Sequence, residues 1–322
     1  MAKPVISIII PTYNRCHILG ATLDSVLAQS FDNWECIIVD DFSKDYTTEL
    51  LEFYLARDKR FLFFSKPPGF RKGANAARNL GFTKSSGRYI NWFDSDDIMH
   101  PDFLKSKVQG ILNNKTIKCT IATFKTFKVQ NGSMIFEKEH SLISNNIFQN
   151  LCTNIHPIPT HGPLWKRSYL EEYELFNEHL SISQDLDFHS RILPKDDEIG
   201  IINFPLFYLR KGHENLTSDL YENIHKHFFS YFQVRMQIVK FYKEKEVIQS
   251  YFKNELMGMF RFLLGKKKYH MCNEILLFLR KTEKPLSFSK KLYFLKIQII
   301  FRTIRILGRG ETRFKSQFKY YG

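Results

Sequence analysis

The sequence has no paired cysteines and no long apolar run. Its five cysteines are spread singly along 322 residues without a CxxC pair, so neither a disulfide framework nor a zinc knuckle is indicated. No stretch approaches the roughly 18 consecutive apolar residues that a membrane-spanning helix needs. The N-terminus lacks the apolar core and the cleavage site of a signal peptide. We therefore expect a cytoplasmic protein with reduced thiols.

Acidic residues are scarce in the last third of the chain. Residues 223–322 carry 22 Lys and Arg against 6 Asp and Glu, whereas residues 1–222 carry 25 against 27. The formal charge of +14 therefore belongs to the C-terminal part. We divide the chain into a domain at 1–220 and a helical, basic C-terminal region at 221–322. Hydrophobic residues at 43% and charged residues at 25% are typical of a folded protein.

Apolar strand patterns alternate with helical patterns at the N-terminus. Val5 to Ile10 is a mostly apolar run stopped by Pro11, and a second run at Glu35 to Val39 ends at Asp40 and Asp41. A helical pattern lies between the two runs, which makes a βαβ unit and predicts a mostly parallel α/β sheet flanked by helices. Two further strands are predicted at 61–64 and 89–93.

The segments that follow three of these strands are polar or acidic. They are Thr12 to Arg15, Asp40-Asp41 and Asp94 to Asp97. Ligands bind outside the carboxyl ends of the strands in open α/β sheets. We therefore expect these three segments to meet at one edge of the sheet and to form a pocket.

The third segment holds Asp94, Asp96 and Asp97, three carboxylates within four residues. Carboxylates this close repel one another unless a cation lies beside them. Oxygen ligands of this kind suit Mg²⁺ or Mn²⁺, which complete their coordination with water and with substrate phosphates. The other interpretation is a polar turn that caps the helix expected to start near Pro101.

A glycine-punctuated basic loop at 69–73 enters an alanine-rich helix. A helix N-terminus with Arg71, Lys72 and Arg78 nearby suits a diphosphate group. The alternative is a closely packed helix with small residues on its inner face and solvated basic side chains.

Residues 120–130 and 134–138 are predicted to form a hairpin, because the Asn131-Gly132 pair between them favours a tight turn. The following loop at 156–163 is rich in Pro and Gly. We expect its His161 to be exposed to solvent, as loop histidines usually are.

Five segments in order resemble the motifs of family 2 glycosyltransferases with the GT-A fold. They are Ser7 to Arg15, Ile37 to Asp45, the GANAARNLG segment at 73–81, Arg88 to Asp97, and Ser183 to Phe188. The resemblance covers about residues 4–215. It implies a Rossmann-like, mixed and mostly parallel sheet flanked by helices at 1–220, which would be the catalytic domain. It also implies that the 156–163 region lines the acceptor site, where contact with a sugar is the alternative to a solvent-exposed His161.

The resemblance also implies roles for individual residues. Asp185 would be the catalytic base, although Gln184 stands where the family usually has Glu. The divalent cation, Mn²⁺ or Mg²⁺, would be held by Asp94, Asp96 and Asp97, with His213 approaching it from the terminal loop. The nucleotide-sugar would contact Pro11, Thr12, Tyr13, Asn14, Asp41, Arg71, Arg78, Asp94 and Ser95.

The helical pattern at 290–309 combines basic and apolar residues. Lys291, Gln298, Arg302, Arg305 and Arg309 fall on one narrow stripe, and apolar residues spread over the rest of the helix. A helix of this kind can lie in an anionic membrane interface. The alternative is a helix docked on its own domain with one solvated stripe.

We expect an inverting, metal-dependent glycosyltransferase that moves a sugar from a UDP-sugar to a saccharide or lipid-linked saccharide in bacterial surface polysaccharide synthesis. Peripheral binding at the inner face of the cell membrane is a further hypothesis. A sugar nucleotidyltransferase is the rival enzyme, but it should carry a glycine-rich basic loop where this chain has Pro11-Thr12-Tyr13-Asn14. The third hypothesis is a non-catalytic module that binds a membrane or a nucleic acid. Nucleic-acid binding is not expected, because no recognised motif accompanies the basic charge.

Overall fold

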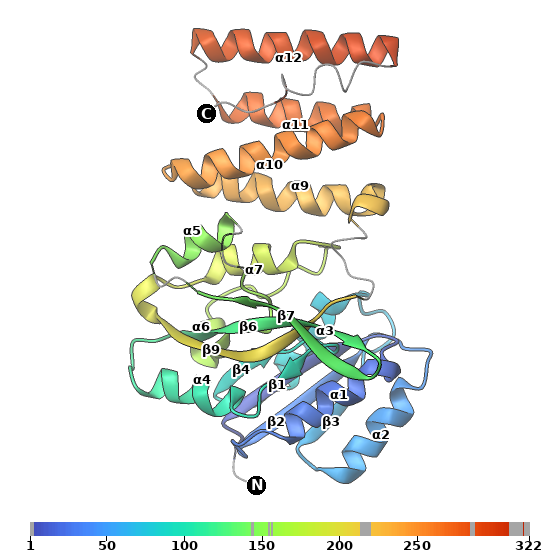
Figure 1. Cartoon of the computed structure of the whole chain (residues 1–322), viewed down its shortest axis with the longest axis vertical. Helices are drawn as coiled ribbons and strands as arrows, with labels where there is room; N and C mark the ends of the chain where they lie inside the picture. Colours follow the sequence, from blue (N-terminus) through green and yellow to red (C-terminus); the bar gives the residue numbers. More distant parts are fainter. Residues whose placement is uncertain are drawn as a thin grey trace. The chain divides into compact units, whose positions relative to one another are not determined.

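The computed structural model describes residues 3–142, 145–153, 155, 157–212, 220–283, 287–308 and 318. The chain separates into two units, Met1–Ser218 and Asp219–Gly322. Strands occur in the first unit, and the second is helical (Figure 1). Each unit is described by itself below.

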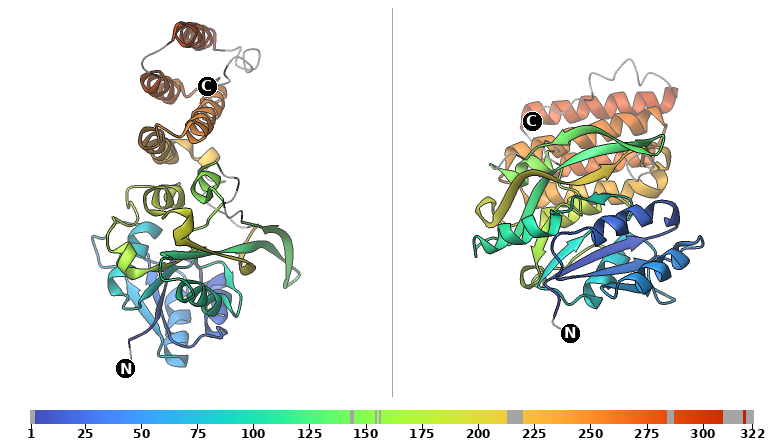
Figure 2. Two further views of the ribbon diagram at one scale, coloured as in Figure 1. Left: turned by 90° about the vertical axis from the view of Figure 1, so that its left-hand side faces the viewer. Right: turned by 60° about the horizontal axis from the view of Figure 1, so that its bottom comes forward.

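Four parallel strands form one half of the sheet in the first unit. Their order is β3 (Phe61–Ser65), β2 (Trp34–Asp40), β1 (Ile6–Thr12) and β4 (Tyr89–Trp92). Every residue of β1 is buried, because helices cover both faces of this half (Figure 2). Ile8 and Ile10 pack toward Leu19 and Leu23 of α1, which explains the continuous apolar run that the sequence shows.

The second half of the sheet is mixed. From β4 the order continues through β8 (Leu164–Lys166), β6 (Cys119–Gln130), β9 (Ile199–Arg210) and β5 (Ile98–Met99), and β7 (Ser133–His140) pairs with β6. Strands β6 and β9 are parallel, whereas β8 runs antiparallel to both β4 and β6.

Helices of the first unit connect these strands. They are α1 (Cys16–Leu27), α2 (Thr47–Arg57), α3 (Ala74–Lys84), α4 (Phe103–Leu112), α5 (Ile147–Cys152), α6 (Arg167–Leu170) and α7 (Gln184–Ile192), with a 3₁₀ turn at Asp196–Glu198. The predicted hairpin is confirmed as β6 and β7. Asn131 and Gly132 between them have φ of 50° and 76°, the left-handed backbone that a tight hairpin turn needs.

The second unit consists of four described helices, α9 (Ile224–Phe241), α10 (Glu246–Gly265), α11 (Tyr269–Thr282) and α12 (Phe288–Leu307). Arg235 of α9 forms an ion pair of 2.8 Å with Glu255 of α10, and Glu283 accepts hydrogen bonds from Lys253 and Lys290. The predicted helical C-terminal region is therefore confirmed. Among the described helices, none combines the length and the apolar character needed to cross a bilayer.

Helix α3 packs very closely on the sheet at Gly81. A Cβ atom at this position would lie 2.3 Å from Cγ2 of Ile9 and 3.4 Å from Cγ2 of Val39. The small residues of this helix thus serve packing, as the alternative interpretation of the alanine-rich segment expects.

Replacing Gly81 by Ala should lower the free energy of unfolding by about 1–3 kcal/mol, because the added methyl group would overlap Ile9 in a packed core. Gly20→Ala on α1 is the matched control, since its Cβ would lie 3.7 Å from its nearest neighbour, Oη of Tyr54. This control should gain about 0.5–1 kcal/mol from the removal of a helical glycine. Urea denaturation measures both changes, and two variants of equal stability would contradict the close contact.

Candidate active site

The loops that follow β1, β2 and β4 meet at one edge of the sheet, as predicted. The backbone N–H of Asn14 donates to Oγ of Ser43 at 2.8 Å, and Oδ1 of Asn14 accepts from the backbone N–H of Lys44 at 2.8 Å. Arg15 lies 3.9 Å from the carboxylate of Asp96. The first and second loops are therefore joined by hydrogen bonds, and the third faces the first through an ion pair.

The residues proposed for the nucleotide differ in exposure. Pro11 and Thr12 are buried, Asn14 is half-buried, and Tyr13 is 50% exposed. Asp41 is buried and contacts Lys66 through an ion pair. Its Oδ2 also accepts from the backbone N–H of Gly73 at 2.6 Å. The N-cap amide of α3, where the sequence suggested that a diphosphate binds, therefore already donates its hydrogen bond to Asp41.

The two arginines of the basic segment lie in different environments. Arg78 is buried, and its Nη2 donates to Oδ1 of Asp94 at 2.8 Å while its Nη1 donates to Oδ1 of Asn75 at 3.2 Å. Arg71 is exposed, and its backbone carbonyl accepts from Lys66. Of the two, only Arg78 lies against the acidic loop.

The acidic loop at 94–97 is partly buried. Ser95 and Asp97 are buried, whereas Asp94 and Asp96 keep side-chain exposures of 31% and 18%. The capping interpretation is not supported, because strand β5 follows the loop and α4 begins only at Phe103. The acids therefore face the sheet edge instead of capping a helix.

The charges in this loop are unequally compensated. Burial would raise the pKa of Asp94, but the charges of Arg78 and His161 outweigh it and hold that pKa well below its usual range. Burial raises the pKa of Asp97, and the charges of Asp96 and Asp94 raise it further, so that the opposing charge of His161 does not compensate them. Asp94 is therefore a stable anion, and Asp97 is the carboxylate that needs a further cation.

His161 is buried, with 1% exposure, so the expectation of a solvent-exposed loop histidine was wrong. Its Nδ1 lies 3.3 Å from Oδ2 of Asp94, and its Nε2 lies 3.2 Å from Oδ2 of Asp97. Burial alone would lower the pKa of His161, but the charges of Asp97 and Asp94 raise it. The ring thus lies between two carboxylates of the acidic loop.

Buried side chains hold the loop that carries His161. Nδ2 of Asn91 donates to the carbonyls of His161 and Pro163 at 3.0 and 2.8 Å. Nζ of Lys107, on α4, donates to the carbonyl of Gly162 and, at 3.3 Å, to that of Thr120. Sequence reasoning missed both residues. The available signal was a polar side chain inside an apolar pattern, as in the strand around Asn91.

Arg210 is another residue that sequence reasoning did not select. At the end of β9, its backbone N–H donates to Oδ1 of Asp97 at 2.7 Å, and its Nε donates to the carbonyl of Asp96 at 2.8 Å. The loop is thus held by a residue 113 positions away. The proposed ligand His213 follows shortly after and lies outside the described residues.

Asp185 lies in the first turn of α7 and is half-buried. Its Oδ1 accepts a hydrogen bond from Oγ1 of Thr160. Burial raises the pKa of Asp185 and the charge of Asp94 adds to the rise, whereas Arg78 and the Thr160 hydroxyl oppose it. Its neighbour Asp187 is bound to Arg191 at 2.9 Å. Asp185 is therefore the carboxylate of α7 whose raised pKa and lack of a direct ion pair with any described residue suit a proton acceptor.

Comparison with known proteins agrees with this geometry. The sequence model described as Glycosyl transferase family 2 matches residues 7–174. The chain belongs to glycosyl transferase family 2. The resemblance that the five sequence segments indicated is thereby confirmed.

Relatives of this glycosyltransferase include an uncharacterised glycosyltransferase of Rickettsia felis, 32% identical over 227 residues, which are 67% of this chain and 36% of the relative. Escherichia coli WfgD, named as a UDP-Glc:alpha-D-GlcNAc-diphosphoundecaprenol beta-1,3-glucosyltransferase, is 39% identical over 111 residues, which are 34% of this chain and 42% of the relative. The chain spans between 17% and 59% of the length of the curated relatives that it matches, and 36% of the first of them.

A solved structure shares the fold of the glycosyltransferase. S. aureus TarS 1-349 in complex with UDP-GlcNAc matches with a TM-score of 0.66 at 18% identity, covering 99% of this chain and 93% of that chain. At this identity the similarity establishes the fold alone. The predicted GT-A type, with a mixed sheet flanked by helices and a helical C-terminal region, is confirmed.

The donor atoms of Asp94, Asp97 and His161 fit a divalent cation. One ligand atom from each residue lies within 4.8 Å of the others. Carboxylate oxygens suit Mg²⁺ and Mn²⁺, and an imidazole nitrogen also binds divalent transition metals. The site of the glycosyltransferase therefore has the donors that a divalent cation needs.

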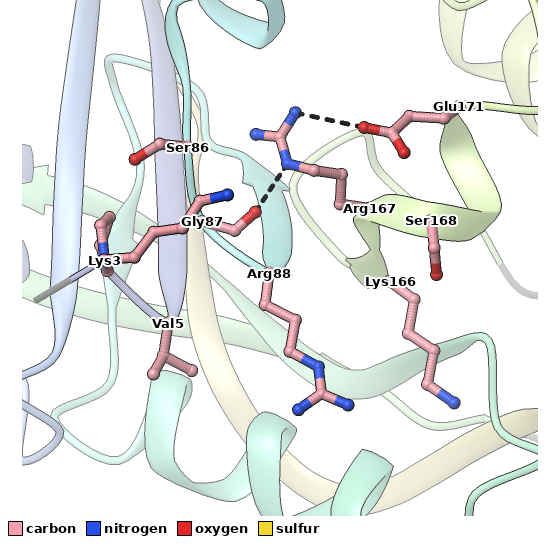
Figure 3. A pocket seen from close by; sticks show the side chains of 10 residues that line it. Lys3, Val5, Ser86, Gly87, Arg88, Lys166, Arg167, Ser168 and Glu171 are labelled. Carbon is pink, nitrogen blue, oxygen red and sulfur yellow. Dashed lines mark hydrogen bonds and ion pairs between the residues drawn. The ribbon is translucent and has the colours of Figure 1, made fainter.

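A cavity of about 580 Å³ lies at the opposite edge of the sheet, where the strands begin (Figure 3). Its central cation, Arg167, is already engaged, because Nε donates to the carbonyl of Gly87 at 2.7 Å and Nη1 lies 3.9 Å from Glu171. Ligands of open α/β sheets bind at the other edge. We assign this cavity no part in the candidate active site.

Lys107→Met should lower the free energy of unfolding by about 1–3 kcal/mol, because it leaves the buried carbonyls of Gly162 and Thr120 without their donor. Burial lowers the pKa of Lys107 to about 7. Lys105→Met, at an exposed position of the same helix, should change stability by less than about 0.5 kcal/mol. Thermal and urea unfolding measure both variants. A Lys107 variant as stable as the Lys105 control would show that the loop is held by other contacts.

Proposed function

We propose that the protein transfers a sugar with inversion from a nucleotide-diphospho-sugar, a UDP-sugar, to a hydroxyl of a saccharide or lipid-linked saccharide. The observation that supports it best is the pairing of two unlike carboxylate environments. Asp94 and Asp97 lie against Arg78 and His161. Asp185 accepts only a neutral hydroxyl among its described hydrogen bonds and has a raised pKa.

These two environments suit the two charge changes of the reaction. The departing diphosphate gains negative charge and needs cations, whereas the attacking hydroxyl loses a proton and needs a base. One carboxylate cannot serve both, because direct pairing with a cation lowers the pKa of a carboxylate and weakens it as a base. At Asp185 burial outweighs the opposing charge of Arg78. We therefore assign residues 1–220 as the catalytic domain, with the leaving group near Arg78 and the acceptor hydroxyl near Asp185.

The names of similar proteins support the choice of donor and acceptor. WfgD is named for UDP-Glc and for a sugar bound to diphosphoundecaprenol, and TarS was solved with UDP-GlcNAc. Another relative, Bacillus subtilis TuaG, is named as a putative teichuronic acid biosynthesis glycosyltransferase. A UDP-sugar donor and an acceptor of bacterial surface polysaccharide synthesis are consistent with these names. We further propose that the reaction takes place on the cytoplasmic side of the membrane.

In the proposed displacement, Asp185 accepts the proton of the acceptor hydroxyl as its oxygen attacks the anomeric carbon. The bond between that carbon and the diphosphate oxygen breaks on the opposite face, so the anomeric configuration inverts. Thr160 orients the carboxylate of Asp185 through its hydroxyl, and Arg78 supplies positive charge beside the acidic loop. A divalent cation, Mn²⁺ or Mg²⁺, bound by residues of the acidic loop would add positive charge toward the diphosphate.

Purified protein should slowly hydrolyse one or more nucleotide-sugars of a panel in Mn²⁺ and lose that activity in EDTA. Asp185→Asn should reduce turnover by about 10²–10⁴-fold, the usual contribution of a general base, while UDP affinity is retained. Asp187→Asn is the matched control, and its turnover should stay within about tenfold of the original because Asp187 pairs with Arg191.

Two results would contradict the proposal. Formation of a UDP-sugar and pyrophosphate from UTP and a sugar phosphate would identify the rival nucleotidyltransferase. Failure to bind UDP or to hydrolyse any nucleotide-sugar would favour the non-catalytic module.

Helix α12 has an exposed apolar face that suits contact with a membrane surface. The sequence pattern did not distinguish this face from the buried apolar face of the same helix. Phe294, Ile297, Phe301 and Ile304 form a buried row, with the ring of Phe301 5.7 Å from that of Phe260. The docked-helix interpretation is therefore correct for this row. On the opposite side, a second apolar row lies within about 60° of arc and is 53–83% exposed. It consists of Phe288, Leu292, Leu295, Ile299 and Ile306.

Basic side chains border this exposed row. Lys291 and Arg302 lie on one side and Lys296 on the other, all exposed. No acidic residue occurs between Glu283 and Glu311, so pairing two copies through this face would bring like charges together. Of the stripe predicted from sequence, Arg309 lies outside the described residues. An anionic lipid surface is the partner that satisfies both the apolar row and its basic borders.

Replacing Leu292, Leu295 and Ile299 together by Gln should abolish co-sedimentation with anionic lipid vesicles at low salt and leave nucleotide-sugar hydrolysis intact. Binding of the original protein should weaken as salt rises, because the basic borders contribute on the order of 1 kcal/mol each. Val247→Gln with Leu277→Gln, at exposed apolar positions of α10 and α11, should bind as the original does. A protein that ignores anionic vesicles at low salt, or a face that instead joins two copies in solution, would refute the proposal.

A further inference from the structure

The two ring nitrogens of His161 differ: Nδ1 is hydrogen-bonded to Asp94, whereas Nε2 lies near Asp97 but makes no hydrogen bond within the described part of the chain. Nδ1 faces Oδ2 of Asp94 at 3.3 Å. Nε2 is buried and makes no hydrogen bond to any described residue, although Oδ2 of Asp97 lies 3.2 Å away. A buried polar atom without a hydrogen bond is costly. Nε2 of His161 is therefore a buried polar atom that is available to a ligand.

Hydrogen bonds to the loop backbone and two aromatic rings hold His161 in this position. Asn91 and Lys107 bind three successive carbonyls of the His161 loop, those of residues 161, 162 and 163. The ring also packs edge-on against Phe93 and Phe207, with centroid distances of 5.2 and 4.7 Å. The buried side chains thus fix the backbone at His161, and the two aromatic rings pack against its imidazole, which limits the directions that Nε2 can take.

The arrangement matches the way proteins present histidine to a metal. A ligating histidine usually donates its other ring N–H to a carboxylate, which fixes the ring and makes the ligand more basic. Here Asp94 is that carboxylate, itself held by Arg78 at 2.8 Å. Neighbouring ligands in an octahedral shell of about 2.1 Å radius lie about 3 Å apart. The 3.2 Å between Nε2 and Oδ2 of Asp97 is close to that spacing.

We propose that His161 binds the divalent cation through Nε2, beside an oxygen of Asp97, and that Asp94 positions the imidazole instead of binding the cation directly. This assignment rests on the proposed function and adds a nitrogen ligand to it. Imidazole favours transition metals over Mg²⁺, which prefers oxygen ligands. His161 would therefore bias the site toward Mn²⁺.

Pulsed EPR of the Mn²⁺–UDP complex tests the assignment without measuring turnover. Protein labelled with ¹⁵N at histidine should show nitrogen coupling to Mn²⁺, and His161→Gln should lose it. The same substitution should weaken Mn²⁺ binding by more than about tenfold and Mg²⁺ binding by less, so that the ratio of the two affinities falls. Asp94→Asn should keep the coupling while weakening Mn²⁺ binding by about 10–100-fold, as expected for a residue that orients a ligand. His179→Gln, at an exposed position, is the control and should change nothing.

The labelled original protein decides the question even if the His161 variant does not fold. A Mn²⁺–UDP complex without nitrogen coupling would overturn the assignment, and the glycosyltransferase activity could still stand on nucleotide-sugar hydrolysis. Coupling that persists in His161→Gln would assign the nitrogen to another histidine and overturn it as well. Failure of the original protein to bind Mn²⁺ and UDP at all would refute the proposed function together with this inference.

Discussion

Repulsion among three carboxylates in one short loop is the constraint around which the first unit is built. Asp94, Asp96 and Asp97 lie too close together to be buried without compensation. Arg78 compensates Asp94 from α3, and Arg210 binds the loop from the end of β9. His161 adds a third contact from the loop before β8. Contacts from α3, β9 and the loop before β8 thus meet at this acidic loop.

The loop around His161 couples this acidic loop to the candidate base. Thr160 donates to Asp185, and the next residue, His161, lies against Asp94 and Asp97. A displacement of this loop would therefore disturb both groups of carboxylates at once. The buried side chains of Asn91 and Lys107 donate to the loop carbonyls. We infer that these hydrogen bonds keep the acidic loop and Asp185 at a constant position relative to each other.

Charge is distributed differently in the two units. The first is close to neutral and concentrates carboxylates at the carboxyl edge of its sheet, whereas residues 223–322 carry 22 basic residues against 6 acidic ones. Within the second unit the acids Glu255 and Glu283 are used in internal ion pairs. The exposed basic residues of α12 are thereby left to border an apolar row. The two units consequently suit chemically different partners, a diphosphate with its cation and an anionic surface.

The sequence by itself determined the four parallel strands and the edge at which polar segments gather, because parallel strands align their carboxyl ends whatever the packing around them. It did not predict β5, β8 and β9, which complete the mixed half of the sheet. The Asn131-Gly132 turn was equally local, since two left-handed residues specify a tight hairpin. Only the tertiary structure decided that His161 is buried, that Lys107 and Arg210 contact the site, and that α12 has two opposite apolar rows. Burial depends on which distant segments cover a residue. The contacts that bury His161 and bind Asp97 join residues 67 and 113 positions apart, and no local pattern records them.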